Sequence, residues 1–370
     1  MQKDDEQREQ KELSANSSFT VAPSYFAGSH RHELTIEQYC AGVLAGDFTI
    51  LARALTLVES STPRHQQMAD ELLAGLLPHT GGAIRIGITG VPGVGKSTFI
   101  EVFGLHLILQ GKKVAVLAVD PTSGISGGSI LGDKTRMSRL ATEPSAYIRP
   151  SPSAGTTGGV ARKTRECMLV CEAAGYDVVL IETIGVGQSE TMVANITDSF
   201  VALMLPGAGD ELQAIKRGLL ELVDVIVVNK ADGPNVAAAQ TAAHQYAMVL
   251  KSLSSNIPPL PLGEGRGEGA VDQAPAVLTC SALNDVGIDK VWSTIDERYA
   301  AAISAGQLNE RRNRQNLRWL WSTVDDRLAQ AVRTHPAVHK LHAELEAKVL
   351  AGQITPESAA HQILEAFGIS

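Results

Sequence analysis

The sequence is poor in aromatic residues and in cysteine, and it has no long apolar run. Aromatic residues make up 4% of the 370 positions, and the only cysteines are Cys40, Cys167, Cys171 and Cys280. Four cysteines in so long a chain predict no disulfide framework, which favours a reducing compartment. No apolar run approaches the ~18 to 20 residues that cross a bilayer. We therefore expect no membrane association.

An excess of basic residues is also missing. The chain has 32 Lys and Arg against 40 Asp and Glu, a net charge of −8. A general nucleic-acid binder needs clustered Lys and Arg, so we expect no nucleic-acid partner. Residues 1–12 are charged, with many acids and no apolar core, which predicts neither a secretory signal nor an organelle transit peptide. We expect a cytoplasmic protein.

The composition is that of an ordinary globular protein, with 44% apolar and 19% charged residues. Residues 1–29 are polar and predict a disordered tail. A helical segment is expected over 30–80, where apolar residues recur at helical spacing in runs that begin near Thr35, Phe48 and Pro63. The main domain is expected over 81–292.

In the main domain, runs of β-branched and apolar residues alternate with helical patterns. The predicted strands are 84–89, 114–119, 177–182, 199–204, 224–229 and 276–279. Strands that are apolar throughout are typical of a parallel sheet that is buried on both faces. The fold class is therefore α/β, with a mostly parallel central sheet flanked by helices and with helical extensions at both ends.

Two further segments lie outside this alternation. Residues 257–275 are rich in Pro and Gly and predict a flexible surface insertion. Residues 293–370 predict a helical extension, which begins with one long helix from about Ser293 to Arg333. Its apolar residues share one face, namely Leu317, Leu320, Trp321, Val324 and Leu328. Such a face either mediates dimerisation or folds back on its own domain, and the sequence leaves both open.

The pattern Gly90-x-x-x-x-Gly95-Lys96-Ser97 lies between a predicted strand and a predicted helix. Glycines let backbone amides curl around a phosphate at the positive end of the helix, and Lys96 adds a cation. A chance match is expected in roughly one chain of this length in a hundred, and the strand–loop–helix context lowers that further. This is a P-loop. Its predicted phosphate-binding residues are Gly90, Val91, Pro92, Gly93, Val94, Gly95, Lys96, Ser97 and Thr98.

A bound nucleotide implies Mg²⁺, which prefers hydroxyl and carboxylate oxygens. Asp120 and Glu182 end consecutive predicted strands, where ligands of parallel sheets bind. Asp133 lies in a glycine-rich segment that is typical of a switch loop. The predicted catalytic residues are Lys96, Asp120, Asp133 and Glu182, and the predicted metal ligands are Ser97, Asp120, Asp133 and Glu182. Each acid alone is explained equally well as a helix cap or a solvated turn.

Two residues after Glu182 have candidate roles. The backbone amide of Gly185 is placed to meet the γ-phosphate, so its segment would order with the triphosphate. Gln188 either orients a water molecule or caps the following helix.

The segment Asn229-Lys230-Ala231-Asp232 directly follows a predicted strand. A carboxylate at Asp232 can accept hydrogen bonds from both N1–H and the exocyclic amine of guanine, and adenine offers no such pair. Lys230 can cover the base and Asn229 can tie the loop together. Ser281, Ala282 and Leu283 follow the last strand and complete the predicted base pocket. The nucleotide is therefore GTP or GDP.

These motifs together resemble the MeaB/ArgK/MMAA family, the P-loop GTPases associated with methylmalonyl-CoA mutase. The features beyond a generic GTPase are residues 119–123, 128–137 and 182–190, with Glu182 where most GTPases have Asp. Residues 209–218, which include Lys216, resemble an additional switch. The resemblance runs from about residue 35 to the C-terminal helices. The insertion at 257–275 departs from the family pattern.

The resemblance implies a homodimeric GTPase that hydrolyses GTP and uses Mg²⁺. It also implies a chaperone for an adenosylcobalamin-dependent acyl-CoA mutase, which gates cofactor delivery and protects or reactivates the mutase. By motif, Lys96 and Ser97 would have phosphate and metal roles, and Asp120, Asp133 and Glu182 would have metal or switch roles. The C-terminal helices at 293–370 would mediate dimerisation.

Three alternatives stay open. A metallochaperone-type GTPase shares this core, but Cys167 and Cys171 are four residues apart without a matched histidine, which favours core packing. A transport-linked kinase, the older ArgK label, needs an acceptor site that the sequence does not reveal. A nucleotide-dependent structural switch would have negligible turnover.

Overall fold

The computed structural model describes residues 34–119, 137–150, 157–183, 188–207, 217–255 and 274–369. Residues 36–370 form one compact unit, to which the following description applies. Several sequence predictions lie outside the described residues: the tail at 1–29, the acids Asp120 and Asp133, Gly185, Lys216 and most of the insertion at 257–275.

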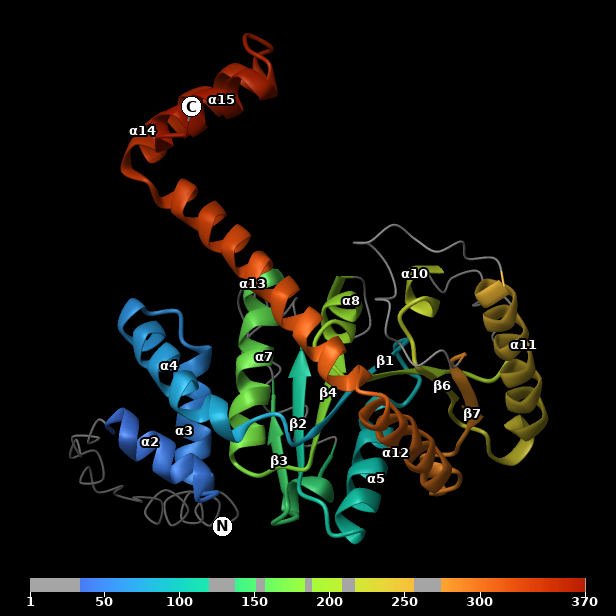
Figure 1. The fold of residues 1–370 in the computed structure, drawn as a ribbon. Helices are drawn as coiled ribbons and strands as arrows, with labels where there is room; N and C mark the ends of the chain where they lie inside the picture. Colours follow the sequence, from blue (N-terminus) through green and yellow to red (C-terminus); the bar gives the residue numbers. More distant parts are fainter. Residues whose placement is uncertain are drawn as a thin grey trace, which may run out of the picture. The chain divides into compact units, whose positions relative to one another are not determined.

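A seven-stranded sheet forms the centre of the unit, in the order β3-β2-β4-β1-β5-β6-β7 (Figure 1). All of its pairings are parallel. The strands are β1 (Ile84–Gly90), β2 (Val114–Val119), β3 (Ala146–Arg149), β4 (Val178–Thr183), β5 (Ser199–Met204), β6 (Val225–Val228) and β7 (Ala276–Thr279). The predicted α/β class with a parallel sheet is confirmed, and its six expected strands are all present within a residue or two.

The seventh strand, β3, was not predicted from the sequence. It has four residues, and only its pairing with β2, from Val114–Ala146 to Leu117–Arg149, identifies it as a strand. Its sequence Ala-Tyr-Ile-Arg ends in a charged residue and lacks the continuous apolar and β-branched run that marks the predicted strands.

Helices cover both faces of the sheet. On one face, Phe99 and Phe103 of α5 (Lys96–Leu109) and Trp292 of α12 (Ile288–Ser304) pack with Ile86 and Ile88 of β1. On the other face lie α8 (Gln188–Ala194) and α7 (Thr157–Ala173), which contact each other and β4. Among the described residues, the domain also contains α10 (Arg217–Leu220) and α11 (Val236–Ser255), and α11 contacts β6 and β7. Continuous apolar strands are thereby buried on both sides.

Among the described residues, three α-helices precede the sheet, as the helical patterns predict. They are α2 (Ile36–Leu44), α3 (Phe48–Glu59) and α4 (Pro63–Leu76), and they pack on one another and on α7. Asp47 begins α3, because its Oδ1 accepts hydrogen bonds from the amides of Thr49 and Ile50 at 2.8 and 2.9 Å. Cys167 and Cys171 of α7 are both buried, as the core-packing interpretation expects.

The C-terminal region is helical but is divided differently from the prediction. The long helical stretch predicted from about Ser293 to Arg333 is interrupted: α12 ends at Ser304, and α13 (Gln307–Thr334) begins after a break. Gly306 lies in the break with φ +72°, a left-handed conformation that ends helices and that glycine adopts without strain. The helices α14 (Pro336–Leu350) and α15 (Pro356–Phe367) follow.

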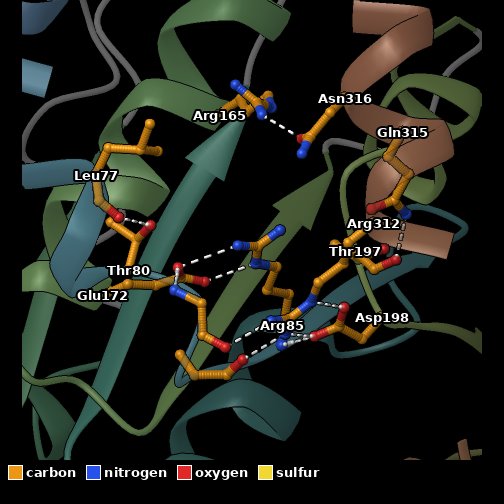
Figure 2. A network of polar contacts seen from close by, with 12 residues as sticks. Leu77, Thr80, Arg85, Arg165, Glu172, Thr197, Asp198, Arg312, Gln315 and Asn316 are labelled. Atoms are coloured by element: carbon orange, nitrogen blue, oxygen red, sulfur yellow. Dashed lines mark hydrogen bonds and ion pairs between the residues drawn. The ribbon is translucent and has the colours of Figure 1, made fainter. Parts of the chain in front are cut away.

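The first turns of α13 are bound to the starts of β1 and β5 through Arg312 (Figure 2). Its Nε and Nη2 donate to Oδ1 and Oδ2 of Asp198 at 2.9 and 2.6 Å. The same guanidinium donates to the carbonyl oxygens of Gly81 and Ala83 at 2.6 and 2.8 Å. One residue of α13 therefore fixes the helix against two segments that are more than 100 positions away in the sequence.

A second ion pair lies beside the first and extends the network to α7. Arg85 donates through Nε and Nη2 to the carboxylate of Glu172 at 2.6 and 3.0 Å. Glu172 also accepts from the amide of Gly81 at 2.7 Å, and Asp198 accepts from the amide of Arg85 at 2.9 Å. Arg85, Glu172 and Asp198 are all buried, so their charges depend on one another for compensation.

Replacement of Arg312 by Met should therefore destabilise the fold strongly. It leaves Asp198 buried without its cation, which typically costs about 3 kcal/mol. Arg314→Met is the matched control on the same helix, because Arg314 pairs only with exposed Glu310 at 3.7 Å and should cost at most about 0.5 kcal/mol. Urea unfolding curves of both variants measure the difference. Equal losses in the two variants would contradict the role assigned to Arg312.

Within the part of the chain that the structure describes, no helix is both long and apolar enough to cross a lipid bilayer.

Candidate functional site

Four strands direct their carboxyl ends to one edge of the sheet. β1 leads into the phosphate loop, β4 ends next to Glu182, β6 leads into Asn229, and β7 leads into Cys280 and Ser281. Because all strands are parallel, these ends meet at the same edge. β1 lies between β4 and β5, and the chain continues from there to both sides of the sheet. Such a switch point is where open α/β sheets bind ligands.

The phosphate loop depends on two glycines in special positions. A Cβ at Gly90 would lie 2.6 Å from the carbonyl oxygen of Leu203, closer than any side chain can approach. Gly95 has φ +91°, and a Cβ there would lie 3.1 Å from Asn229 Nδ2. α5 begins directly afterwards at Lys96, so the loop amides and the positive end of the helix face the same space. This geometry suits the anion site that the sequence predicts.

Lys96 bends back over the loop. Its Nζ donates to the carbonyl oxygen of Gly90 at 2.7 Å and to that of Val91 at 3.4 Å. Burial lowers the pKa of Lys96, and the carboxylates of Glu182 and Glu190 act in the opposite direction. A nucleotide phosphate can replace the two carbonyls as the acceptor and offers a full charge in their place.

Ser97 and Glu182 meet beside the loop. Ser97 Oγ donates to Glu182 Oε1 at 3.4 Å, although the two residues are 85 positions apart. A hydroxyl and a carboxylate are oxygen ligands that suit Mg²⁺, which keeps its remaining positions for water and phosphate. The other two predicted ligands, Asp120 and Asp133, lie outside the described residues, as does Gly185. The described residues contain no group of three or more His, Cys, Asp or Glu side chains placed to hold a metal.

Asn229 connects the base segment to the phosphate loop and to the segment after β7. Its Nδ2 donates to the carbonyl oxygen of Val94 in the phosphate loop at 2.9 Å, and its Oδ1 accepts from the amide of Ala282 at 3.1 Å. The thiol of Cys280 also donates to this Oδ1 at 3.4 Å. Burial raises the pKa of Cys280 to about 12, so the thiol keeps the proton that it donates. The sequence patterns did not identify Cys280, because its role depends on a contact 51 residues away.

Asp232, the predicted base-binding residue, is held by Ser281. Ser281 Oγ donates to Asp232 Oδ2 at 2.5 Å. The amides of Ser281 and Ala282 are used inside the protein, by Val286 O and Asn229 Oδ1. The amide of Leu283 is therefore the candidate donor to guanine O6. Leu283 is 79% exposed, so we expect its backbone amide, and not its side chain, to contact the base.

Lys230 links the base segment to the phosphate loop. It adopts φ +59°, which is unusual for a residue with a side chain, and its Nζ donates to the carbonyl oxygen of Gly93 at 2.7 Å. Pro92, Gly93 and Thr98 are exposed around this contact. The phosphate and base segments are thus connected twice, through Asn229–Val94 and through Lys230–Gly93.

These features together define the class of the protein. A P-loop at a helix N-terminus, a carboxylate beside its serine and an Asn-Lys-x-Asp segment after a core strand are the parts of a P-loop GTPase.

Comparison with known proteins gives the family. Residues 51–337 match the family model described as methylmalonyl Co-A mutase-associated GTPase MeaB. The chain belongs to this family of GTPases. The family resemblance drawn from the sequence, and the expectation of a GTPase, are confirmed.

Three relatives illustrate the similarity. A probable GTPase of Mycobacterium tuberculosis is 50% identical over 339 residues, which cover 92% of this chain and 97% of that protein. The mouse methylmalonic aciduria type A homolog, named as mitochondrial, is 40% identical over 349 residues, covering 92% and 81%. A crystal structure described as LAO/AO transport system kinase is 37% identical with a TM-score of 0.68, covering 89% of this chain and 96% of that one.

Asp232→Asn should change the nucleotide preference. The amide replaces an acceptor by a donor opposite the guanine amine, so GTP affinity should fall about 10- to 100-fold. Xanthosine triphosphate, which carries a carbonyl at that position, should bind better than GTP to the variant.

Asp285→Asn is the matched control for this experiment. Asp285 is exposed in the loop after β7, which also contains Ser281, and has φ +54°, a conformation that Asn tolerates, so nucleotide binding should not change. Equilibrium binding of fluorescent nucleotides measures both variants. An unchanged GTP affinity in Asp232→Asn would remove the base-pocket assignment.

Proposed function

We propose that this chain is a GTP-hydrolysing chaperone for an adenosylcobalamin-dependent acyl-CoA mutase of the methylmalonyl-CoA type. In this role it gates cofactor delivery and protects or reactivates the mutase. The observation that carries the proposal is a guanine-type base segment tied to a P-loop, in a chain that matches the mutase-associated family over residues 51–337. We propose that the protein acts in the cytoplasm, which agrees with its four free cysteines.

Hydrolysis of GTP at this site is a matter of position and charge. Phosphoryl transfer needs its charged oxygens held and neutralised, with little covalent participation by the protein. The amides at the start of α5 and the Lys96 ammonium hold the phosphates, and Asp232 and the Leu283 amide hold the base. Ser97 and Glu182 would hold a Mg²⁺ ion, which supplies charge neutralisation on the phosphates when bound.

The isolated chain is expected to turn over slowly. In such sites a partner often supplies a positive charge that stabilises the transition state. The sequence context of the arginines in this chain does not identify one for that role. We therefore propose that contact with the mutase orders the switch segments and accelerates hydrolysis. GTP hydrolysis then times the release of a mutase that has received its cofactor.

Phosphate release measured with and without purified methylmalonyl-CoA mutase tests this proposal. We expect the mutase to raise the rate by at least about tenfold, the effect of about 1.4 kcal/mol in the barrier. Lys96→Met should abolish turnover in both mixtures, which excludes a contaminating phosphatase. An acyl-CoA enzyme without cobalamin serves as the partner control. The same rate with and without the mutase would contradict the chaperone proposal.

The two catalytic alternatives make different demands. A metallochaperone would need a cluster of His or Cys ligands, and none of three or more lies among residues that the structure describes. A kinase would transfer the phosphate to an acceptor, so phosphate release would fall short of GTP consumption. Equal amounts of GDP and free phosphate in the assay favour the hydrolase.

We also propose that the chain is a homodimer joined through α13. The first turns of this helix are fixed to their own domain by Arg312, but its later turns present an apolar stripe. The exposed fractions of the stripe are 60% for Leu317, 54% for Leu320, 65% for Trp321 and 50% for Leu328. Contiguous apolar residues of this size on a helix are typical of an interface, and a two-fold axis lets one stripe pack on its copy.

Trp321→Glu should separate the two copies. A buried tryptophan at the centre of an interface commonly contributes 2 kcal/mol or more, so the dimer dissociation constant should rise about 30-fold or more. Leu109→Glu is the control, because Leu109 is 87% exposed at the end of α5 and away from the stripe. Light scattering over a concentration series measures both. A monomeric wild-type chain, or a Trp321→Glu variant that stays dimeric, would contradict the proposed interface.

A further inference from the structure

Two threonines form a buried hydrogen bond between the strands that lead into the two halves of the phosphate and metal site. Thr183 Oγ1 donates to Thr89 Oγ1 at 2.8 Å. Both residues are completely buried. Thr89 immediately precedes Gly90 of the phosphate loop, and Thr183 immediately follows Glu182.

This bond lies where β1 and β4 separate. Their register ends at the pair Ile88–Glu182. On the far side of each strand the pairing continues, because β1 stays with β5 as far as Gly90–Leu203 and β4 stays with β2 as far as Val119–Thr183. The Thr89–Thr183 contact is therefore one step beyond the shared ladder, at the point where the two chains diverge.

The threonines lie on the opposite face of the sheet from the metal ligand. Side chains alternate along a strand, so Glu182 and Ile88 share the face of α5, whereas Thr89 and Thr183 share the face of Gly87. At Gly87 a Cβ would meet Val193 of α8 and Phe200 at 2.7 Å, which marks this as the α8 face. The hydroxyl pair therefore acts on Glu182 only through the backbone of β4.

Stability alone is a weak reason for two hydroxyls at these positions. A cross-strand threonine pair contributes about 0.2–1 kcal/mol, and two valines would fill the same space with equal or better strand preference. What the hydroxyl pair adds is a directional bond, which fixes how far the end of β4 lies from the end of β1. That separation sets the distance between Glu182 on β4 and Ser97 beyond β1, now 3.4 Å between Oε1 and Oγ.

We propose that Thr89 and Thr183 are positioning residues, which hold the carboxylate of Glu182 at the distance from Ser97 that a Mg²⁺–nucleotide complex requires. This inference rests on the proposed function, because it takes Ser97 and Glu182 as the metal-binding pair. Neither threonine touches the nucleotide or the ion.

The test is the gain in affinity that Mg²⁺ gives a fluorescent non-hydrolysable GTP analogue, compared with binding in EDTA. Four variants are needed: Thr183→Val, Thr183→Ser, the double change Thr89→Val with Thr183→Val, and Thr197→Val. Thr183→Val leaves a buried hydroxyl on Thr89, whereas the double change replaces both by methyl groups and should restore stability. Thr197→Val is the matched control, since Thr197 is equally buried and bonds to Val193 O at 2.9 Å outside the site.

In Thr183→Val and in the double variant, we expect the gain in affinity from Mg²⁺ to be about tenfold smaller than in the wild type. Binding in EDTA should not change. Thr183→Ser keeps the hydroxyl and should behave as the wild type, as should Thr197→Val. A double variant with the wild-type Mg²⁺ gain would overturn the proposal, because the bond would then serve stability only.

The proposed function fails in a distinguishable way. If the wild-type chain gains no affinity from Mg²⁺ in this assay, or fails to bind the GTP analogue, the Ser97–Glu182 metal site itself is wrong. If the wild type gains affinity and the double variant gains as much, only the positioning role is lost.

Discussion

The parallel alignment of β1 between β4 and β5 is the constraint on which the rest of the structure depends. It places the end of β1, with the phosphate loop, beside the end of β4, with Glu182. β6 and β7 continue the sheet in the same direction, so Asn229 and Ser281 reach the same edge. Residues from four distant parts of the sequence are thus gathered at one edge of the sheet. The predicted contacts to the phosphates, the metal and the base of a guanine nucleotide all lie at this one edge.

The two ends of the same strands serve different purposes. At the carboxyl ends of β1, β6 and β7, contacts such as Asn229–Val94 and Asp232–Ser281 shape the nucleotide site. At the amino ends of β1 and β5, Arg312 and Asp198 fasten α13 to the sheet (Figure 2). The helix that is proposed to join two copies is therefore anchored on the strand that leads into the phosphate loop.

Much of the fold and part of the site were predictable because their signals are local. The phosphate loop is recognised by its glycines and Lys96 between a strand and a helix. The long strands are recognised by their continuous apolar runs. The break at Gly306 was missed because the helical pattern of apolar residues resumes after it. The Arg312–Asp198 pair joins residues 114 positions apart, and arginine on a helix surface is ordinary in any sequence. The roles of all the site residues stay predictions, and Asp120, Asp133 and Gly185 also lie outside the described residues.

The central claim is that this edge of the sheet selects and hydrolyses GTP. The most direct test is phosphate release by the purified chain supplied in parallel with GTP or ATP, and with GTP in the presence of excess ATP. The account predicts turnover of GTP alone, at a rate that excess ATP does not reduce, because the Asp232 carboxylate has no donor pair to accept from adenine. Turnover of ATP at the same rate, or inhibition of GTP turnover by excess ATP, would contradict it.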